Sequence, residues 1–115
     1  MDLTEIINNI PQMVWEINNR GDILYSNTKW NKYTSVTNIF DINFQHPDDI
    51  QKVKDIWDKS SNIFTVKRRL KNNYNIYRWF LTKATKIKND HWVGMCLDIE
   101  EIISLSLSIT HYPCL

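Results

Sequence analysis

The sequence predicts an α+β domain, built on a five-stranded antiparallel sheet with short helices and one main helix on one face. Three observations support this. Aromatic and β-branched residues dominate the C-terminal strands, apolar residues recur with a helical period in the middle of the chain, and turn residues separate neighbouring strands. The helical segments fall between the second and third strands, which favours an antiparallel α+β arrangement. With 115 residues, the chain is long enough for one core and too short for two.

The first ten residues are expected to form an amphipathic cap helix ahead of a domain at residues 11–101. Asp2 and Glu5 have the spacing of a capping box, and Pro11 ends the helix because the residue before a proline is disfavoured in the α region. Apolar side chains recur on one helical face at Leu3, Ile6, Ile7 and Ile10. We expect this helix, over about residues 3–9, to lie on the domain or on a second copy of it.

A first hairpin is predicted directly after Pro11, with strands at residues 13–17 and 23–26. Its turn at residues 19–22 contains Gly21, for which a positive φ costs little. These two strands are the first pair of the predicted sheet.

A short helix should follow the hairpin, because Asn27 is placed to cap it and Trp30 and Tyr33 fall on one of its faces. Residues 34–43 have no clean period and are expected to hold one or two helical turns. The apolar anchors of this region are Ile39, Phe40, Ile42 and Phe44.

The main helix is predicted to open at residues 46–49, with the sequence His-Pro-Asp-Asp. Proline suits the first helical position, and two aspartates in the first turn complement the positive end of the helix dipole. An apolar stripe at helical spacing then comprises Ile50, Val53, Ile56 and Trp57. Residues 59–62 end the helix.

From Ile63 the period changes to two, which predicts a third strand whose apolar face carries Phe64, Val66 and Leu70. Arg68 also falls on this apolar face, which is unusual for a charged residue. After a turn at residues 71–75, a basic hairpin at residues 75–100 supplies the last two strands, with its turn at residues 89–90.

Cations concentrate in residues 64–92 although the net charge is only +1. They are Lys67, Arg68, Arg69, Lys71, Arg78, Lys83, Lys86 and Lys88, against Asp90 alone. This asymmetry indicates either an acidic or nucleic-acid partner or a sheet face solvated by long cationic side chains. Tyr77, Trp79 and Trp92 lie among these cations, an arrangement that resembles a platform on which the bases of single-stranded nucleic acid stack. The net charge near zero and the lack of a ribonucleoprotein-type motif argue against nucleic acid.

Several short motifs, taken in order, match one family. They are Pro11-x-x-Val14-Trp15; Gly21-Asp22-Ile23-Leu24-Tyr25-x-Asn27-x-x-Trp30-x-x-Tyr33-Thr34; His46-Pro47-Asp48-Asp49 with Trp57; Arg69-Leu70; Tyr77-Arg78-Trp79-Phe80; and Trp92-Val93-Gly94 followed by Asp98-Ile99-Glu100. On these residues the chain resembles a PAS domain over about residues 10–101, of the subgroup common in bacterial sensor histidine kinases. It departs from the family pattern at Ser35, where the family usually has glycine, and at residues 72–75, where the family usually has Asp-Gly.

The resemblance implies that the sheet and the main helix enclose a pocket for a small ligand. By position, its lining would be Trp15, Tyr33, Phe44, Val53, Trp57, Phe64, Phe80 and Met95. The alternative interpretation is that these side chains only fill the core. The resemblance also implies that a signal leaves at the end of the last strand, through Asp98, Ile99 and Glu100.

The sequence gives no evidence of a cofactor. Relatives that bind haem use a histidine in the middle of the main helix, and residues 50–56 contain none. Flavin photoreceptors use a cysteine in an Asn-Cys-Arg type of motif on a helix, and neither Cys96 nor Cys114 has that setting. There is no phosphate loop, metal-ligand cluster or nucleophile elbow. We therefore predict a non-enzymatic sensory module with no catalytic and no metal-binding residues, which acts through protein–protein interaction and a small ligand of unknown identity.

Residues 102–115 alternate with period two and lack heptads, which predicts a short strand or a frayed tail. The expected partner is a second copy of the chain or a signalling protein; the alternative is that the chain is a fragment of a larger sensor kinase. No apolar run reaches the roughly 20 residues of a membrane span, and the start does not resemble a secretory signal. The expected location is the cytoplasm.

Overall fold

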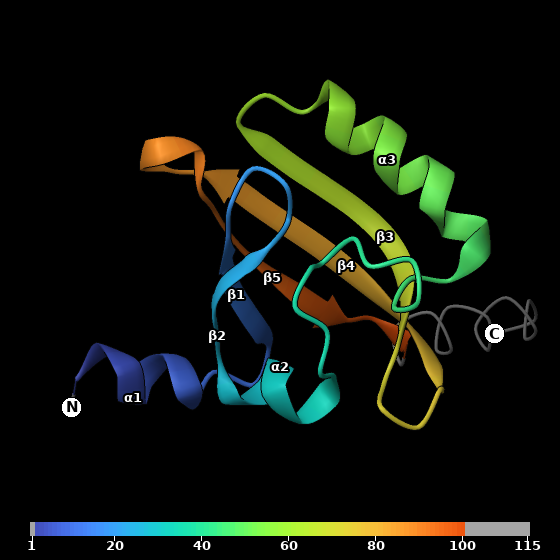
Figure 1. The fold of residues 1–115 in the computed structure, drawn as a ribbon. Helices are drawn as coiled ribbons and strands as arrows, with labels where there is room; N and C mark the ends of the chain where they lie inside the picture. The colour runs from blue at the N-terminus through green and yellow to red at the C-terminus, as the bar shows by residue number, and fades with distance from the viewer. Residues whose placement is uncertain (1, 101–115) are drawn as a thin grey trace, which may run out of the picture.

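The computed structural model describes residues 2–100, and its elements follow the predicted order (Figure 1). The strands are β1 (Met13–Ile17), β2 (Ile23–Ser26), β3 (Ile63–Lys71), β4 (Tyr77–Lys86) and β5 (Trp92–Asp98). The helices are α1 (Leu3–Asn8), α2 (Thr28–Tyr33) and α3 (Ile50–Lys59), with 3₁₀ turns η1 (Pro47–Asp49) and η2 (Lys88–Asp90). The α+β prediction with five antiparallel strands is confirmed. The predicted tail at residues 102–115 lies outside the described residues.

The strand order is β2-β1-β5-β4-β3, and every neighbouring pair is antiparallel. The last strand therefore lies at the centre and joins the N-terminal hairpin to the strands that follow α3. Trp15 of β1 lies opposite Gly94 of β5, and a Cβ atom added to Gly94 would meet the Trp15 ring at 2.6 Å. Glycine at this position thus lets the Trp15 indole lie over β5.

Helices α2 and α3 and the segment that connects them lie on one side of the sheet, which we call the inner face (Figure 1). Inner and outer side chains alternate along each strand, as the period of two requires. The core on the inner face comprises Met13, Trp15, Ile17, Trp30, Ile39, Phe44, Val53, Phe64, Val66, Leu70, Phe80, Ala84, Trp92 and Cys96. Ile23, Tyr33, Val36, Phe40, Ile56 and Trp57 pack against it while half-buried.

The cap helix α1 forms as predicted, and the Asp2 carboxylate accepts a hydrogen bond from the Glu5 amide at 2.8 Å. Its apolar face does not pack on the domain, however. Leu3 is 70% exposed and Ile6 is 44% exposed, and Figure 1 shows the helix pointing away from the sheet. The helix meets the domain near its C-terminal end, where the Ile7 carbonyl accepts from Asn27 Nδ2 and Asn8 Oδ1 accepts from the Thr28 amide. That it lies on the domain or on a second copy stays a prediction.

The start of the main helix differs in detail from the prediction. Residues 47–49 form a 3₁₀ turn, and the α-helix proper begins at Ile50. The His46 ring caps this turn by accepting from the Asp48 amide at 3.1 Å. Asp49 makes no side-chain cap bond; its carboxylate binds Arg69 instead, as described below.

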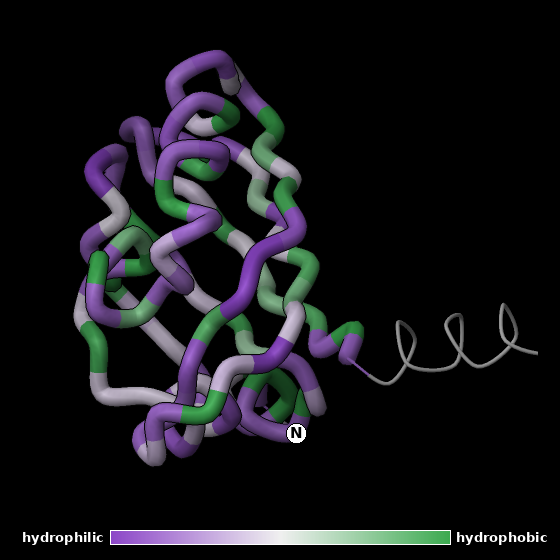
Figure 2. Tube along the Cα trace, turned by 90° about the vertical axis from the view of Figure 1, so that its right-hand side faces the viewer, coloured by the Kyte–Doolittle hydropathy of each residue, from purple (hydrophilic) through white to green (hydrophobic). Residues whose placement is uncertain are grey.

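Figure 2 shows hydrophilic and hydrophobic positions interchanging in short steps along the chain. Within residues 2–100, no helix is long and apolar enough to cross a membrane.

Candidate functional site

Seven of the eight predicted pocket residues lie in one cluster on the inner face. Trp15, Phe44, Val53, Phe64 and Phe80 are buried there, and Tyr33 and Trp57 are half-buried against them. The Trp57 ring is central, with centroids 4.9 Å from Phe40, 5.1 Å from Phe64 and 4.7 Å from Trp92. Most of this cluster is packed aromatic core, which is the alternative that the sequence left open.

Met95, the eighth residue, does not belong to this cluster. It lies opposite Val14 on β1, half-buried, between the inner-facing Gly94 and Cys96. Because side chains alternate along a strand, Met95 points to the outer face. It lines an apolar groove of about 360 Å³ there, together with Val14, Ile63, Lys83, Ala84, Thr85, Val93 and Gly94. The prediction that Met95 lines the inner pocket is therefore wrong, because its side chain lies on the opposite face of the sheet.

A cavity of about 340 Å³ opens where α2 approaches the ends of β1, β4 and β5; we call it the Tyr33 cavity. Its lining is Pro11, Gln12, Met13, Lys29, Tyr33, Arg78, Phe80, Cys96 and Asp98. Met13, Phe80 and Cys96 are buried, whereas Lys29 and Asp98 are exposed at the mouth. Two sets of residues that the sequence predicted separately meet in it: the pocket residues Tyr33 and Phe80, and the exit residue Asp98.

Tyr33 forms one wall of this cavity and is fixed at both ends of its side chain. Its ring packs edge-on against Phe80 with centroids 5.2 Å apart, and its hydroxyl donates to the Leu70 carbonyl at 2.7 Å. Burial raises the pKa of Tyr33, and the negative charge of Asp98 raises it further. The phenol is therefore neutral and acts as a donor at this wall.

The residues predicted as the signal exit, Asp98, Ile99 and Glu100, are hydrogen-bonded to β4. Arg78 donates to both Asp98 oxygens, at 2.7 and 3.3 Å, and the Glu100 carboxylate accepts from the Trp79 amide at 2.7 Å. The Ile99 amide donates to the Trp79 carbonyl at 3.0 Å. The end of β5 is thus held by side-chain bonds in addition to the sheet ladder.

Arg68 is fully buried on the inner face, which confirms the misfit seen in the sequence. Its Nε donates to Thr82 Oγ1 at 3.0 Å, and its Nη1 donates to the Ile39 carbonyl at 2.6 Å and to Gln45 Oε1 at 3.1 Å. Burial lowers the pKa of Arg68. Sequence reasoning missed Gln45, which is buried beside it, because an isolated glutamine in an irregular segment carries no periodic signal.

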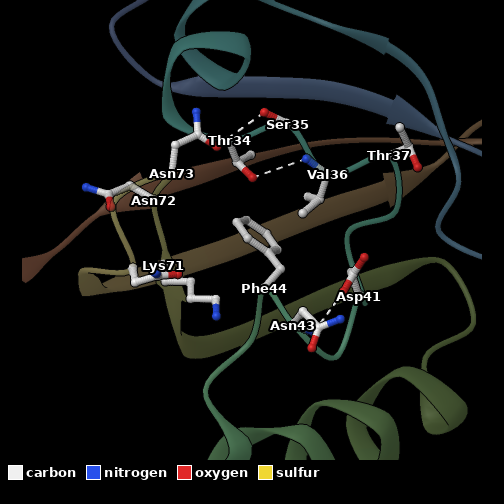
Figure 3. Close-up of a pocket in the computed structure, with 11 residues that line it drawn as sticks. Thr34, Ser35, Val36, Thr37, Asp41, Asn43, Phe44, Lys71, Asn72 and Asn73 are labelled. Carbon is white, nitrogen blue, oxygen red and sulfur yellow. Dashed lines mark hydrogen bonds between the residues drawn. The ribbon is translucent and has the colours of Figure 1, made fainter.

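A second cavity, of about 420 Å³ and more polar, lies at the surface between the segment after α2 and the β3–β4 turn (Figure 3). Figure 3 shows the Phe44 ring pointing into it. Ser35 Oγ donates to Asn73 Oδ1 at 3.2 Å across one side. The two departures from the PAS pattern, Ser35 and the turn at residues 72–75, therefore face each other at this cavity.

The aromatic platform considered for nucleic acid is not present on one face. Trp92 is buried and packs on Trp57 inside the core. Trp79 points the other way and is stacked by Arg69, whose Cζ lies 4.7 Å from the ring centroid. The Tyr77 ring packs on His46 with centroids 4.8 Å apart. Each aromatic residue of the set is thus already in contact with another side chain.

The part of the chain that the structure describes contains no group of three or more His, Cys, Asp or Glu side chains able to hold a metal ion. Cys96 is a free, buried thiol.

No protein-family model matches the sequence, and no curated protein matches it significantly. Solved structures do match. The PAS domain of an HTR-like protein from Haloarcula marismortui has a TM-score of 0.67 at 14% identity, covering 84% of this chain and 94% of that one. The PAS domain of the Cronobacter turicensis RpfR quorum-sensing receptor, in complex with C12:0, has a TM-score of 0.61 at 18% identity, covering 81% and 98%.

An RNA-binding Light-Oxygen-Voltage receptor matches with a TM-score of 0.75 at 14% identity, covering 98% of this chain and 36% of that one. At these identities the likeness concerns the fold. The described chain therefore has the PAS fold, as its motifs predicted.

Proposed function

Because the chain has the PAS fold, we propose that it is a non-catalytic sensory module. It binds a small ligand in the Tyr33 cavity and passes the signal on by associating with another protein, in the first place a second copy of itself. The observation that carries the proposal is the Tyr33 cavity, because it connects core residues on the inner face with Asp98 at the end of β5. Ligand contacts there can change the Arg78–Asp98 pair, which lies at the cavity mouth.

The solved structures that the chain resembles support the sensory part of the proposal. One is the PAS domain of a quorum-sensing receptor with C12:0, and another belongs to a light-oxygen-voltage receptor. A cavity of about 340 Å³ lies at the lower end of the range for small-molecule sites.

The apolar groove on the outer face supports association. Val93 is 41% exposed there and is flanked by Val14 and Met95, and Ile63 extends the apolar surface at the edge strand. The exposed apolar face of α1 adds Leu3 and Ile6. We propose that a second copy covers the groove and α1 together, because such exposed apolar patches commonly mark interaction surfaces.

Light scattering at high micromolar concentration tests the association. We expect a dimer mass for the wild type and a monomer mass for Val93→Lys. Ile42→Lys is the matched control, because Ile42 is 68% exposed but lies away from the groove, and this variant should remain a dimer. A monomer mass for the wild type would contradict the dimer.

Native mass spectrometry of freshly purified protein tests the ligand part. We expect a subunit mass with a small, stoichiometric adduct that is lost from a Phe80→Trp variant, whose larger ring fills the Tyr33 cavity.

Single-stranded nucleic acid is not a partner under this proposal, because Trp92, Trp79 and Tyr77 do not share a free face. A salt-dependent shift with oligonucleotides would overturn this point.

A further inference from the structure

Among the described residues, Arg68 is a buried cation without a counter-charge. It is fully buried, and no carboxylate of the described residues lies within ion-pair distance of it. Asp49 of η1, the carboxylate whose charge acts on Arg68, is bound by Arg69 at 2.9 Å. A guanidinium stays protonated in proteins, and an unpaired buried charge is costly. The core thus contains a positive charge that its own side chains do not neutralise.

The unsatisfied groups on the inner face are donors. Among the described residues, Arg68 Nη2 and Trp15 Nε1 are the buried side-chain nitrogen or oxygen atoms without a hydrogen-bond partner. Both atoms can only donate. What the inner face lacks is therefore an acceptor, and next to Arg68 an anionic one would also supply the missing charge.

Arg68 adjoins the Tyr33 cavity through two shared residues. It lies opposite Phe80 in the pairing of β3 with β4, and Phe80 lines the cavity. Arg68 also donates to Thr82 Oγ1, which lies 3.4 Å from the sulfur of Cys96, and Cys96 lines the cavity too. Phe80 and Cys96 thus link the cavity lining to Arg68, whose guanidinium itself contacts Thr82, Ile39 and Gln45.

We propose that the ligand of the Tyr33 cavity is a small carboxylate with an apolar body, and that Arg68 Nη2 binds its carboxylate once the Phe80 ring turns aside. This inference rests on the proposed ligand-binding function and names the class of its ligand. Met13 and Phe80 are the apolar wall for the body of the ligand. Tyr33 cannot take the place of Arg68, since its hydroxyl is already bound to Leu70.

Two other cations, Lys29 and Arg78, lie at the cavity mouth and are rivals for the carboxylate. Arg78 is already paired with Asp98 at 2.7 Å, and Lys29 is solvated. A carboxylate gains more from the desolvated Arg68 than from an exposed cation, because charge interactions weaken in water.

Calorimetric titration of the full chain with octanoate and with 1-octanol, at pH 7, tests the proposal. The two probes share the apolar chain and differ in the head group. We expect octanoate to bind about tenfold or more tightly than octanol, the range expected for a hydrogen bond to a charged group. Equal affinities would overturn the inference but leave a ligand-binding cavity, and with it the proposed function, in place.

Variants identify the cation. Arg68→Gln keeps a donor but removes the charge, and we expect it to lose the preference for octanoate. Arg78→Gln and Lys29→Gln are matched controls at the mouth and should keep it; a preference lost in either of them and kept in Arg68→Gln would overturn the proposal. If Arg68→Gln does not fold, the ratio of octanoate to octanol affinity in the wild type still tests whether the cavity prefers a carboxylate, and the same ratio in the two control variants still tests the cations at the mouth. No binding of either probe would overturn the inference, while the proposed association is decided separately by light scattering.

Discussion

Asp49 and Arg69 form a three-bond clamp between the start of α3 and the edge strand β3. The Asp49 carboxylate accepts from Arg69 Nε at 3.1 Å, from Nη2 at 2.9 Å and from the Arg69 backbone amide at 2.7 Å. The carboxylate is buried, whereas the neighbouring Asp48 is exposed and lies 3.9 Å from the same guanidinium. The main helix is thus attached to the sheet by one of two adjacent aspartates.

Asp49→Asn should lower the free energy of unfolding by about 1.5–3 kcal/mol at pH 7, because charged hydrogen bonds are replaced by weaker neutral ones. Asp48→Asn is the control and should change it by less than about 1 kcal/mol, as expected for an exposed pair. Urea denaturation measures both. Equal effects of the two substitutions would contradict the clamp.

The same pair predicts an acid-sensitive part of the stability. Burial raises the pKa of Asp49, but the side-chain and backbone hydrogen bonds from Arg69 outweigh this and hold the pKa below its ordinary value of 3.8. A depressed folded-state pKa stabilises the protein fully above the unfolded-state pKa, and this contribution disappears as the pH falls through the folded-state value. We therefore expect a loss of stability below about pH 4 that is smaller in Asp49→Asn, measured by denaturation at a series of pH values.

Asn27 should be the most sensitive polar residue of the N-terminal half. It is fully buried, its Oδ1 accepts from the amides of Val14 and Trp30, and its Nδ2 donates to the carbonyls of Ile7 and Gln12. Asn27→Ala should cost about 2–3 kcal/mol, since the cap of α2 is lost and buried groups become unpaired.

Asn31→Ala is the control for this prediction, because Asn31 is exposed on the same helix. We expect a change within about 0.5 kcal/mol. Hydrogen exchange should also be faster at the Val14 and Trp30 amides in Asn27→Ala alone; unchanged exchange at those amides would speak against the bonds.

Gly94 should not tolerate a side chain. An added Cβ would meet the Lys83 carbonyl at 2.5 Å and the Trp15 ring at 2.6 Å. Gly94→Ala should therefore destabilise the protein by about 1–3 kcal/mol and change the near-UV circular dichroism of Trp15. Val93→Ala, one position earlier on the outer face, should cost less than Gly94→Ala; the opposite order would be inconsistent with the close approach of β1 and β5.

A chain truncated after Glu101 should unfold cooperatively, because it retains the bonds of Ile99 and Glu100 to the backbone of Trp79. A chain truncated after Leu97 loses these bonds and the buried Ile99 side chain, and should be less stable by about 2 kcal/mol or more. Thermal unfolding distinguishes the two. Loss of a cooperative transition in the longer of these two chains would mean that the domain boundary at residue 101 is wrong.

Local patterns were sufficient for the elements of this fold. Turn residues, aromatic and β-branched content and the period-two stretch from Ile63 predicted all five strands. Asn27 and Asp2 were recognised as caps from their spacing alone, because a cap depends on residues three positions apart. The face of the sheet on which a side chain lies was harder to predict than the strand itself. Met95 was assigned to the wrong face, since the register of a central strand is set by both of its neighbours, which are distant in sequence.

The fold class, the order of the elements and the resemblance to PAS domains could be predicted from the sequence, because periodicity, turns and caps depend on residues that are close together in the chain. Three features became visible in the three-dimensional structure only: β5 lies between β1 and β4, Asp49 rather than Asp48 makes the close contacts with Arg69, and Leu3 and Ile6 on the apolar face of α1 are exposed. The structure also shows that Arg68, a charged residue at an apolar position of the sequence pattern, is buried near the Tyr33 cavity. These results depend on contacts between segments far apart in the chain, whose geometry is fixed by the folding of the whole domain and not by local preference.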